Sequence, residues 1–172
     1  MSAPAIILRP VVDTDSDVLF EWINNRDLVV FSAPYRLIGK EEHKAWFEDI
    51  RKKEDIRFFM IEHAETAEAV GSCQLLKIDL VSREAELQIR IGRKEFQNSG
   101  AGSEAVRQLV RFGFNNLNLH RISLHVFTTN RRAIRVYEKN GFVAEKIDLK
   151  SVCIEGEWKD ILFMAKRRSE DA

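Results

Sequence analysis

Apolar residues recur at two spacings along this 172-residue chain, and the spacing predicts where helices and strands lie. Apolar positions three and four residues apart are typical of amphipathic helices, because they fall on one face of the helix. This pattern predicts a first helix that is capped by Thr14 or Asp15 and ends near Asn24 and Asn25. Three further helices are expected at residues 40–53, 103–117 and 130–139.

Alternating apolar and polar residues, together with β-branched and aromatic runs, predict the strands. Seven are expected, at residues 6–9, 57–62, 69–78, 84–91, 121–127, 142–149 and 160–164. The three runs between residues 57 and 91 are separated by short polar turns, which indicates an antiparallel meander. In the run 84–91 the apolar residues are Ala85, Leu87, Ile89 and Ile91, so the other face of this strand presents polar side chains that are available for chemistry.

The order of these elements predicts one α/β (α+β) domain with a mixed, mostly antiparallel sheet flanked by about four helices. A chain of this length is expected to form a single domain with a sizeable core, here covering about residues 6–166. No linker rich in Pro, Gly or Ser divides the chain, and no internal repeat is found. Residues 27–39 are expected to be irregular.

Composition removes several classes of function. The 27 basic and 27 acidic residues balance, so no overall field attracts nucleic acid or an anionic membrane, and neither is expected as a partner. No run approaches the length of about 18 apolar residues that a membrane span needs, and the first ten residues lack a secretory pattern. We therefore expect a cytoplasmic protein.

The cysteines and histidines argue against a metal site. Cys73 and Cys153 are far apart and follow no ligand spacing, so we expect two buried free thiols. The histidines are scattered, with neither metal spacing nor an adjacent acidic partner, which disfavours a metalloenzyme or a hydrolytic triad. Among them, His125 lies on a strand that flanks the candidate site described next.

A glycine-containing loop between a strand and a helix is the sharpest local feature. It runs from Gln97 to Gly102 and contains Gly100. Glycines allow successive backbone N–H groups to face one concavity, and the following helix adds positive potential, so the loop suits a phosphate or pyrophosphate. An ordinary flexible connection is the alternative. The third glycine of a dinucleotide fingerprint and the Gly-Lys-Ser/Thr of a nucleoside triphosphate site are both absent.

A second group of residues follows about thirty positions later. Asn130, Ala133 and Tyr137 share one face of the expected helix, and Asn130 is also a suitable N-cap. Gly141 is suited to the C′ position, and Phe142 follows it. A capped amphipathic helix with a buried tyrosine would account for much of this pattern.

Together the two features resemble the GNAT superfamily of acyl-CoA-dependent N-acetyltransferases. The resemblance covers about residues 8–164 and includes the family's Arg/Gln-x-x-Gly-x-Gly/Ala loop, at Gln97–Gly102, and its Asn-x-x-Ala-x-x-x-Tyr-x-x-x-Gly-Phe helix, at Asn130–Phe142. Within the superfamily the chain is similar to the branch of spermidine, ribosomal-protein and amino-sugar acetyltransferases. Asn118–Ile122 and Ile154–Asp160 are close in style to segments of the spermidine enzymes.

The resemblance implies a cosubstrate, acetyl-CoA, and residues that bind it. In the family, the strand before the loop diverges from its neighbour and leaves backbone groups free for pantetheine, while the loop holds the pyrophosphate. The residues implied here are Gln88, Ile89, Arg90 and Ile91 on the strand, Gln97, Asn98, Ser99, Gly100, Ala101 and Gly102 in the loop, and Asn130 and Ala133 on the later helix. Further basic residues that could meet the remaining phosphates are Arg93, Lys94, Arg131, Arg132 and Arg135, although a solvated basic face is the commoner meaning of such residues.

Acetyl transfer to an amine needs a proton donor for the leaving sulfur and a proton acceptor for the amine. The resemblance places the hydroxyl of Tyr137 beside the CoA sulfur, and a phenol with an ordinary pKa of about 10 is still protonated at neutral pH. We therefore expect Tyr137 to be the general acid. Glu86, on the polar face of strand 84–91, is the candidate general base, and a solvent-facing role is its alternative. A backbone N–H of the same strand, at Ile89 or Ile91, is expected to polarise the carbonyl.

The acceptor is left open by the sequence. A polyamine would need a concentrated acidic pocket, but Ser32 and Ala33 stand where the spermidine enzymes are expected to be acidic. An amino-sugar nucleotide would be served by stacking on Phe31, Tyr35 and Trp46, and a ribosomal protein N-terminus is a third possibility. The alternative function is a non-catalytic module that binds or senses acyl-CoA. A homodimer is possible, since many relatives pair.

Overall fold

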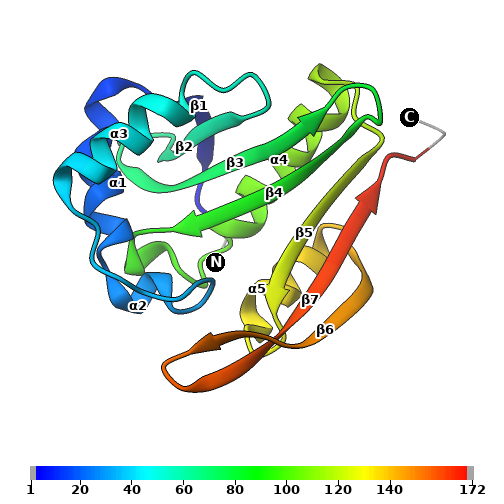
Figure 1. Ribbon diagram of the computed structural model, residues 1–172. Coiled ribbons are helices and arrows are strands. Elements are labelled where there is room, and N and C mark those ends of the chain that lie inside the picture. Colours follow the sequence, from blue (N-terminus) through cyan, green and yellow to red (C-terminus); the bar gives the residue numbers. More distant parts are fainter. Residues whose placement is uncertain (1–2, 170–172) are drawn as a thin grey trace.

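Seven strands form one sheet in the order β1-β2-β3-β4-β5-β7-β6, as the computed structural model of residues 3–169 shows (Figure 1). All neighbouring strands are antiparallel except β4 and β5. The strands are β1 (Ile6–Pro10), β2 (Arg57–His63), β3 (Ala69–Asp79), β4 (Glu84–Ile91), β5 (Arg121–Phe127), β6 (Val143–Ile154) and β7 (Glu157–Arg167). The helices are α1 (Ser16–Ile23), α2 (Arg26–Val29), α3 (Lys40–Ile50), α4 (Ala101–Asn116) and α5 (Arg131–Lys139), and single 3-10 turns lie at Asp13–Asp15 and Lys94–Phe96.

The mixed, mostly antiparallel fold expected from the sequence is confirmed, and β4 and β5 have the predicted bounds. The expected start of the third long helix is wrong by two residues. It begins at Ala101, because Gly100 adopts the left-handed conformation (φ +94°) and serves as the N-cap. The short α2 inside the expected irregular segment was not predicted, and β6 and β7 are longer than expected. Most side chains of β6 are exposed, so the strand shows only a weak alternation of apolar residues and its full length was not predicted.

Two layers of helices cover opposite faces of the sheet. Adjacent residues of β2 show this directly, because Met60 packs with α1 and α3 while Ile61 packs in the cluster that contains α4. Neighbouring residues of a strand point to opposite faces, so α1 and α3 lie on one side of β2–β4 and α4 lies on the other. Helix α5 contributes Ile134 and Tyr137 to the same cluster as α4.

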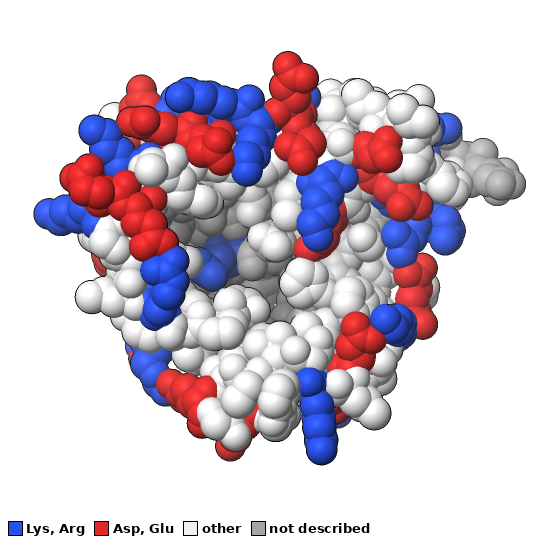
Figure 2. Space-filling view, viewed as in Figure 1, with Lys and Arg blue, Asp and Glu red and all other residues white. Residues whose placement is uncertain are grey.

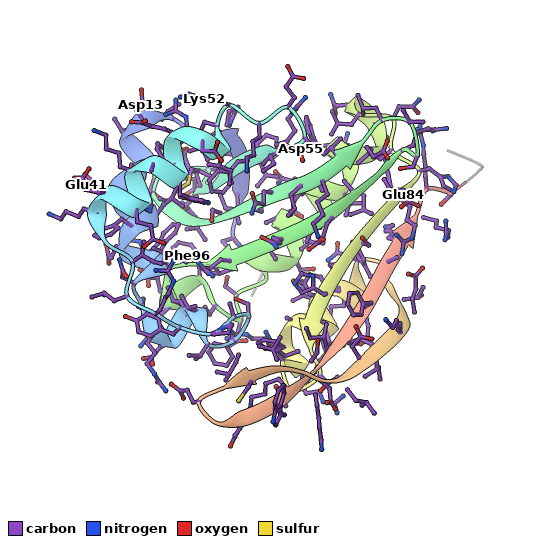
Figure 3. All side chains as sticks on the ribbon, in the orientation of Figure 1. Asp13, Glu41, Lys52, Asp55, Glu84 and Phe96 are labelled. Carbon is purple, nitrogen blue, oxygen red and sulfur yellow. The ribbon has the colours of Figure 1, made fainter. Side chains whose placement is uncertain are left out.

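The sheet divides between β4 and β5. These strands pair through only three residues each, with Glu84–Glu86 facing Arg121–Ser123. Beyond Glu86, β4 stays paired with β3 while β5 stays paired with β7, and the two strands separate like the arms of a V (Figure 1). Figure 3 shows Glu84 where the strands still run together, and Phe96 beyond the far end of β4. One edge of β4 is therefore left without a strand partner over its second half.

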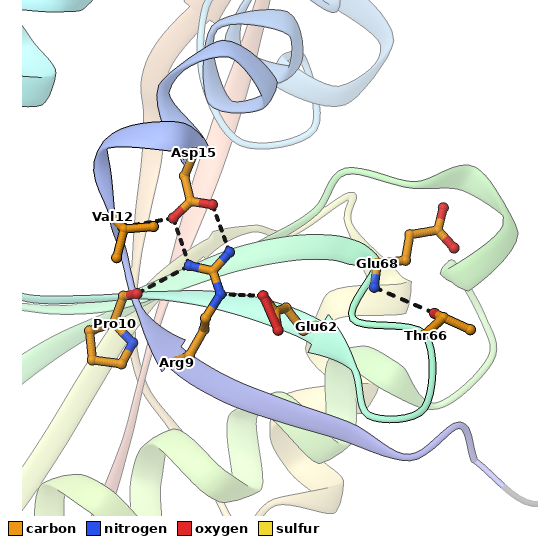
Figure 4. A network of polar contacts seen from close by, with 7 residues as sticks. All are labelled: Arg9, Pro10, Val12, Asp15, Glu62, Thr66 and Glu68. Carbon is orange, nitrogen blue, oxygen red and sulfur yellow. Dashed lines mark hydrogen bonds and ion pairs between the residues drawn. The ribbon is translucent and has the colours of Figure 1, made fainter.

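A polar network fixes the start of α1 against the sheet (Figure 4). Arg9 of β1 donates two 2.7 Å hydrogen bonds to Asp15 and also pairs with Glu62 of β2. Although burial opposes ionisation of Asp15, the hydrogen bonds from Arg9 and from the Val12 N–H hold its pKa below the ordinary value. The expected side-chain cap is wrong, because Asp15 occupies the N-cap position but its carboxylate is used by Arg9 and Val12.

Gly92, just after β4, lies directly against the indole of Trp22 on α1. A Cβ added at Gly92 would come within 2.1 Å of the ring, and Trp22 is a buried core residue. We expect Gly92→Ala to lower the free energy of unfolding by about 1–3 kcal/mol, the usual effect of overpacking. Urea denaturation checks this, with Gly39→Ala as the control, because nothing lies within 4 Å of that Cβ position. Equal stability of the two variants would contradict the tight packing of α1 on β4.

The cysteines differ from the expectation in one respect. Cys73 is buried in the core, where burial raises the pKa of its thiol, but Cys153 on β6 is exposed. The prediction of two buried thiols is therefore wrong for Cys153. Its neighbours on the edge strand β6, Val152 and Ile154, pack in one apolar cluster, so Cys153 points to the opposite, exposed face of the strand. Among residues 3–169, no helix has the length and hydropathy that crossing a membrane requires.

Candidate active site

A cavity of about 980 Å³ occupies the gap between β4 and β5. Its wall is formed by β3, β4 and β5, by α1, α3 and α5, and by the loop before α4. Figure 2 shows the face with this hollow, in which a basic side chain lies inside and charged side chains of both signs lie around it. A cavity of this size is large enough for a cofactor chain together with a small second molecule.

The loop Gln97–Gly102, hereafter the anion-binding loop, forms one end of the cavity. Asn98 and Gly100 have positive φ values of 61° and 94°, which turn the chain sharply into α4. The N–H groups of Gly102 and Ser103, in the first turn of this 16-residue helix, make no hydrogen bond to any described residue. Free N–H groups at a helix N-terminus favour an anion, as the sequence predicted for this loop.

Basic side chains of α5 stand next to this loop. The cavity wall includes Arg132, Arg135 and Lys139, and Arg132 Nη1 donates a 3.2 Å hydrogen bond to Gln97 Oε1. Of the other basic residues considered from the sequence, Arg93 pairs with Glu68 and does not line the cavity. The arrangement can therefore surround a pyrophosphate with N–H donors on one side and guanidinium groups on the other.

The unpaired half of β4 runs from the closed end of the gap toward the anion-binding loop. Gln88, Ile89, Arg90 and Ile91 all line the cavity. Since no strand covers this edge, its backbone groups can pair with an extended amide-containing chain such as pantetheine. These four residues and the anion-binding loop thus line one cavity, and their contact with a cofactor stays a prediction.

Tyr137 lies on the cavity wall across from β4, on the inward face of α5. Burial, with no contribution from a neighbouring charge or hydrogen bond, raises the pKa of its phenol to about 12. The hydroxyl therefore remains protonated throughout the ordinary pH range. Asn130 has the capping role that the alternative interpretation gave it, because its Oδ1 accepts the Ala133 N–H at 3.2 Å, yet Asn130 and Ala133 both line the cavity as well.

Glu86 lies at the closed end of the gap, where β4 and β5 part. Its side chain is 13% exposed, with Oε1 3.0 Å from His125 Nδ1 and Oε2 2.8 Å from Lys77 Nζ. Contact with His125, opposed by burial and helped by Lys77, lowers the pKa of Glu86 to about 2. His125 lines the cavity and Glu86 does not. The sequence could not single out this pair, because its members lie on strands that meet only in the folded sheet.

The lowered pKa of Glu86 has a consequence for stability. Because the folded value of about 2 is below the ordinary value of about 4.3, the stabilisation is present above pH 4.3 and is lost as the pH falls toward 2. We expect the difference in unfolding free energy between the wild type and Glu86→Gln to shrink as the pH falls from about 4.3 toward 2. Urea titrations at several pH values test this. Glu84→Gln, on the same face of β4, is the control, and a difference that already disappears between pH 6 and 5 would contradict the prediction.

The three aromatic residues considered for acceptor binding do not all reach the cavity. Phe31 and Trp46 line it and are 52% and 42% exposed, which leaves both rings free to contact a ligand. Tyr35 is not part of the wall, and its hydroxyl donates a 3.1 Å hydrogen bond to the Asn24 carbonyl. The structure adds Gln74 on β3 and His43 on α3, which the sequence pattern did not connect with the site.

The open edge of β4 beside free helix N–H groups suits a ligand that carries both amide groups and phosphates, as an acyl-CoA does. Residues 5–143 match the family described as an acetyltransferase (GNAT) domain. The chain belongs to this GNAT family and is an acetyl-CoA-dependent N-acetyltransferase, as the resemblance predicted. The free loop N–H groups and the open edge of β4 fit acetyl-CoA. No group of three or more potential metal ligands is found among residues 3–169.

Similar proteins support the assignment of this chain to the GNAT family. The spermidine N(1)-acetyltransferase of Vibrio cholerae is 30% identical over 161 residues, which cover 92% of this chain and 91% of that protein. The enzyme of the same name from Escherichia coli K12 is 30% identical, covering 95% of this chain and 86% of its own length. The crystal structure of the Vibrio cholerae spermidine N-acetyltransferase with CoA and spermine superimposes with a TM-score of 0.86 at 29% identity, covering 94% of this chain and 95% of that one.

Proposed function

We propose that the protein transfers the acetyl group of acetyl-CoA to a primary amine by direct attack within a ternary complex. The observation that supports this most strongly is the single cavity that joins the anion-binding loop, the open edge of β4, Tyr137 and His125. Acetyl-CoA supplies a thioester whose acetyl group can be attacked by an amine. The protein must hold it, polarise its carbonyl and move two protons.

The proton for the leaving sulfur is assigned to Tyr137. Its phenol lies on the cavity wall and stays protonated, because burial raises its pKa to about 12. A donor that remains protonated at neutral pH can supply a proton as the carbon–sulfur bond breaks. A backbone N–H on the open edge of β4, at Ile89 or Ile91, is assigned to the carbonyl oxygen.

The proton of the amine is assigned to His125, with Glu86 as a positioning residue. A carboxylate with a pKa of about 2 is a weak proton acceptor, so the low pKa argues against Glu86 as the base itself. His125 lines the cavity, and its Nδ1 faces Glu86 at 3.0 Å, so Nε2 is the nitrogen left to accept a proton. A carboxylate beside one nitrogen of an imidazole can orient the ring.

Release of free thiol tests the proposed function. Purified protein is incubated with acetyl-CoA and a panel of primary amines, and free CoA is followed with time. We expect release that depends on the amine, and a strong loss of it in His125→Gln with unchanged binding of acetyl-CoA. Tight binding in calorimetry without release for any amine would favour the non-catalytic acyl-CoA-binding alternative. Release at equal rates with and without amine would contradict direct transfer.

The identity of the acceptor, the cytoplasmic location and pairing into a homodimer stay predictions. The names of the two spermidine enzymes support a polyamine, while an amino-sugar nucleotide and a ribosomal protein N-terminus were the other acceptors expected from the sequence.

A further inference from the structure

Arg90 is a partly buried cation on the cavity wall, with no charged partner among the described residues. It projects from the polar face of β4 and lines the cavity. No carboxylate or other charged group of the described residues acts on it, and burial alone lowers the pKa of its guanidinium. A partly buried guanidinium without a counter-charge keeps its N–H donors free for a ligand that provides an anion when it binds.

The direction of Arg90 separates it from the site of the pyrophosphate. Gly102 of α4 lies against Ile91, whose Cγ1 is 3.6 Å from the position of a Cβ on Gly102. Since successive strand residues point to opposite faces, Ile91 faces α4 and the anion-binding loop, while Arg90 faces the side covered by α1 and α3. Arg90 is therefore positioned toward the acceptor half of the cavity.

The acceptor half has little negative charge to hold a polycation. Five basic side chains and one carboxylate line the cavity. The one carboxylate, Glu42, already forms an ion pair with Arg36. The three basic residues on α5 lie beside the anion-binding loop, where a pyrophosphate is expected. Arg90 lies away from that loop and has no charged partner among the described residues. A spermidine chain, which carries only positive charge, would be repelled here.

A hydrogen-bond acceptor without a donor lies close to Arg90. Gln74 of β3 faces Gln88 across the strand pair, and Ser72 faces Arg90. Gln74 Nε2 donates to Gln88 Oε1 at 2.9 Å, but the buried Gln74 Oε1 has no partner. Residues that face each other across a strand pair share one face of the sheet, so Gln74 lies on the same face as Gln88 and Arg90. A free acceptor for an ammonium group and a free cation thus lie on one face of the sheet and line the same cavity.

We propose that the acceptor amine also carries an oxyanion, a carboxylate or a phosphate, which Arg90 binds while Gln74 Oε1 accepts a hydrogen bond from the amine. Such a ligand supplies the missing counter-charge of Arg90 and the missing donor of Gln74 together. A guanidinium binds carboxylate and phosphate groups through the same pair of N–H donors, so the two sources share one chemistry. This inference rests on the proposed acetyl transfer and specifies the substrate class of that reaction.

Matched pairs of acceptors test the proposal in the thiol-release assay. The pairs are L-methionine with L-methioninamide, and glucosamine 6-phosphate with glucosamine, and spermidine is assayed beside them. We expect the anionic member of at least one pair to have a kcat/KM at least about tenfold above its neutral partner, mainly through a lower KM. An advantage confined to the first pair identifies a carboxylate, and one confined to the second identifies a phosphate.

Variants show whether Arg90 is responsible for the advantage. We expect Arg90→Gln to reduce it to less than about threefold and Arg90→Lys to keep part of it, while the Kd for acetyl-CoA measured by calorimetry stays within about twofold of the wild type. Arg107→Gln is the matched control, since it removes one exposed positive charge from α4 outside the cavity wall. Thermal unfolding of Arg90→Gln is expected near the wild-type temperature, because no charged partner of Arg90 among the described residues is lost.

Several outcomes would overturn the inference. They are equal kcat/KM within both pairs, a preference for spermidine over the anionic acceptors, and an Arg90→Gln variant that loses acetyl-CoA affinity and leaves acceptor selectivity unchanged. Each of these would leave acetyl transfer itself standing, because thiol is still released. Absence of release with every amine would instead remove the proposed function together with this inference.

Discussion

Replacement of Tyr137 by Phe is expected to lower kcat by about 100-fold and to leave the binding of acetyl-CoA unchanged. The substitution removes only the hydroxyl, and the aromatic ring can keep its packing against Phe142, whose centroid lies 5.9 Å away. The leaving sulfur then departs without a proton donor. Stopped or continuous thiol-release assays give kcat, and calorimetry with acetyl-CoA gives the Kd.

Two further measurements separate this role from a structural one. The phenol has no charged or hydrogen-bonded neighbour acting on it, so Tyr137→Phe should unfold at the same temperature as the wild type or slightly above it. Because burial raises the pKa of Tyr137 to about 12, the donor stays protonated as the pH rises to 10, and no loss of kcat from its ionisation is expected below that value. Turnover within about threefold of the wild type in Tyr137→Phe would exclude the assigned role.

A carboxylate placed at Gly102 should abolish the binding of acetyl-CoA. The N–H of Gly102 is one of the free donors in the first turn of α4, and the side chain of Gly102→Glu would stand where an anion is expected. We expect the Kd to rise by on the order of 100-fold, since juxtaposed like charges cost several kcal/mol. The fold should persist, because an acidic residue in the first turn of a helix is favourable.

Gly102→Ala is the matched control for this variant. A Cβ at this position meets Ile91 at 3.6 Å, an ordinary contact, and glycine is the weaker helix former of the two. We expect Gly102→Ala to be as stable as the wild type or more stable by up to about 1 kcal/mol, with a much smaller rise in the Kd than Gly102→Glu. Equal Kd values for the wild type and Gly102→Glu would move the pyrophosphate away from the anion-binding loop.

The sequence predicted the fold well where apolar patterns were dense. Strands β4 and β5 were predicted with their observed bounds, because their inward faces alternate through Leu87 and Leu124 into the core. It failed for α2, which has four residues and lies inside a segment without clear periodicity, and for the length of the largely exposed β6. Short or exposed elements bury too few side chains to leave a pattern.

Site residues that belong to one local motif could be predicted from the sequence, whereas contacts between segments far apart in the sequence could not. The anion-binding loop and the helix of Tyr137 were found because each is a local motif, and the structure brings both onto one cavity. Tyr35 was drawn in by residue type alone, and the fold turns its hydroxyl toward the Asn24 carbonyl instead. The contact of Glu86 with His125 joins neighbouring strands that are not adjacent in sequence, so no spacing rule could have found it.

Because the pairing between β4 and β5 is short, the stability of the folded protein should depend on binding of its cosubstrate. Only three residue pairs join the two halves of the sheet, so a bound pantetheine would bridge edges that otherwise face solvent. A ligand that binds only the native state raises its stability by about 2.7 kcal/mol at one hundred times its Kd. The enzyme should therefore resist proteases and heat best when acetyl-CoA is bound.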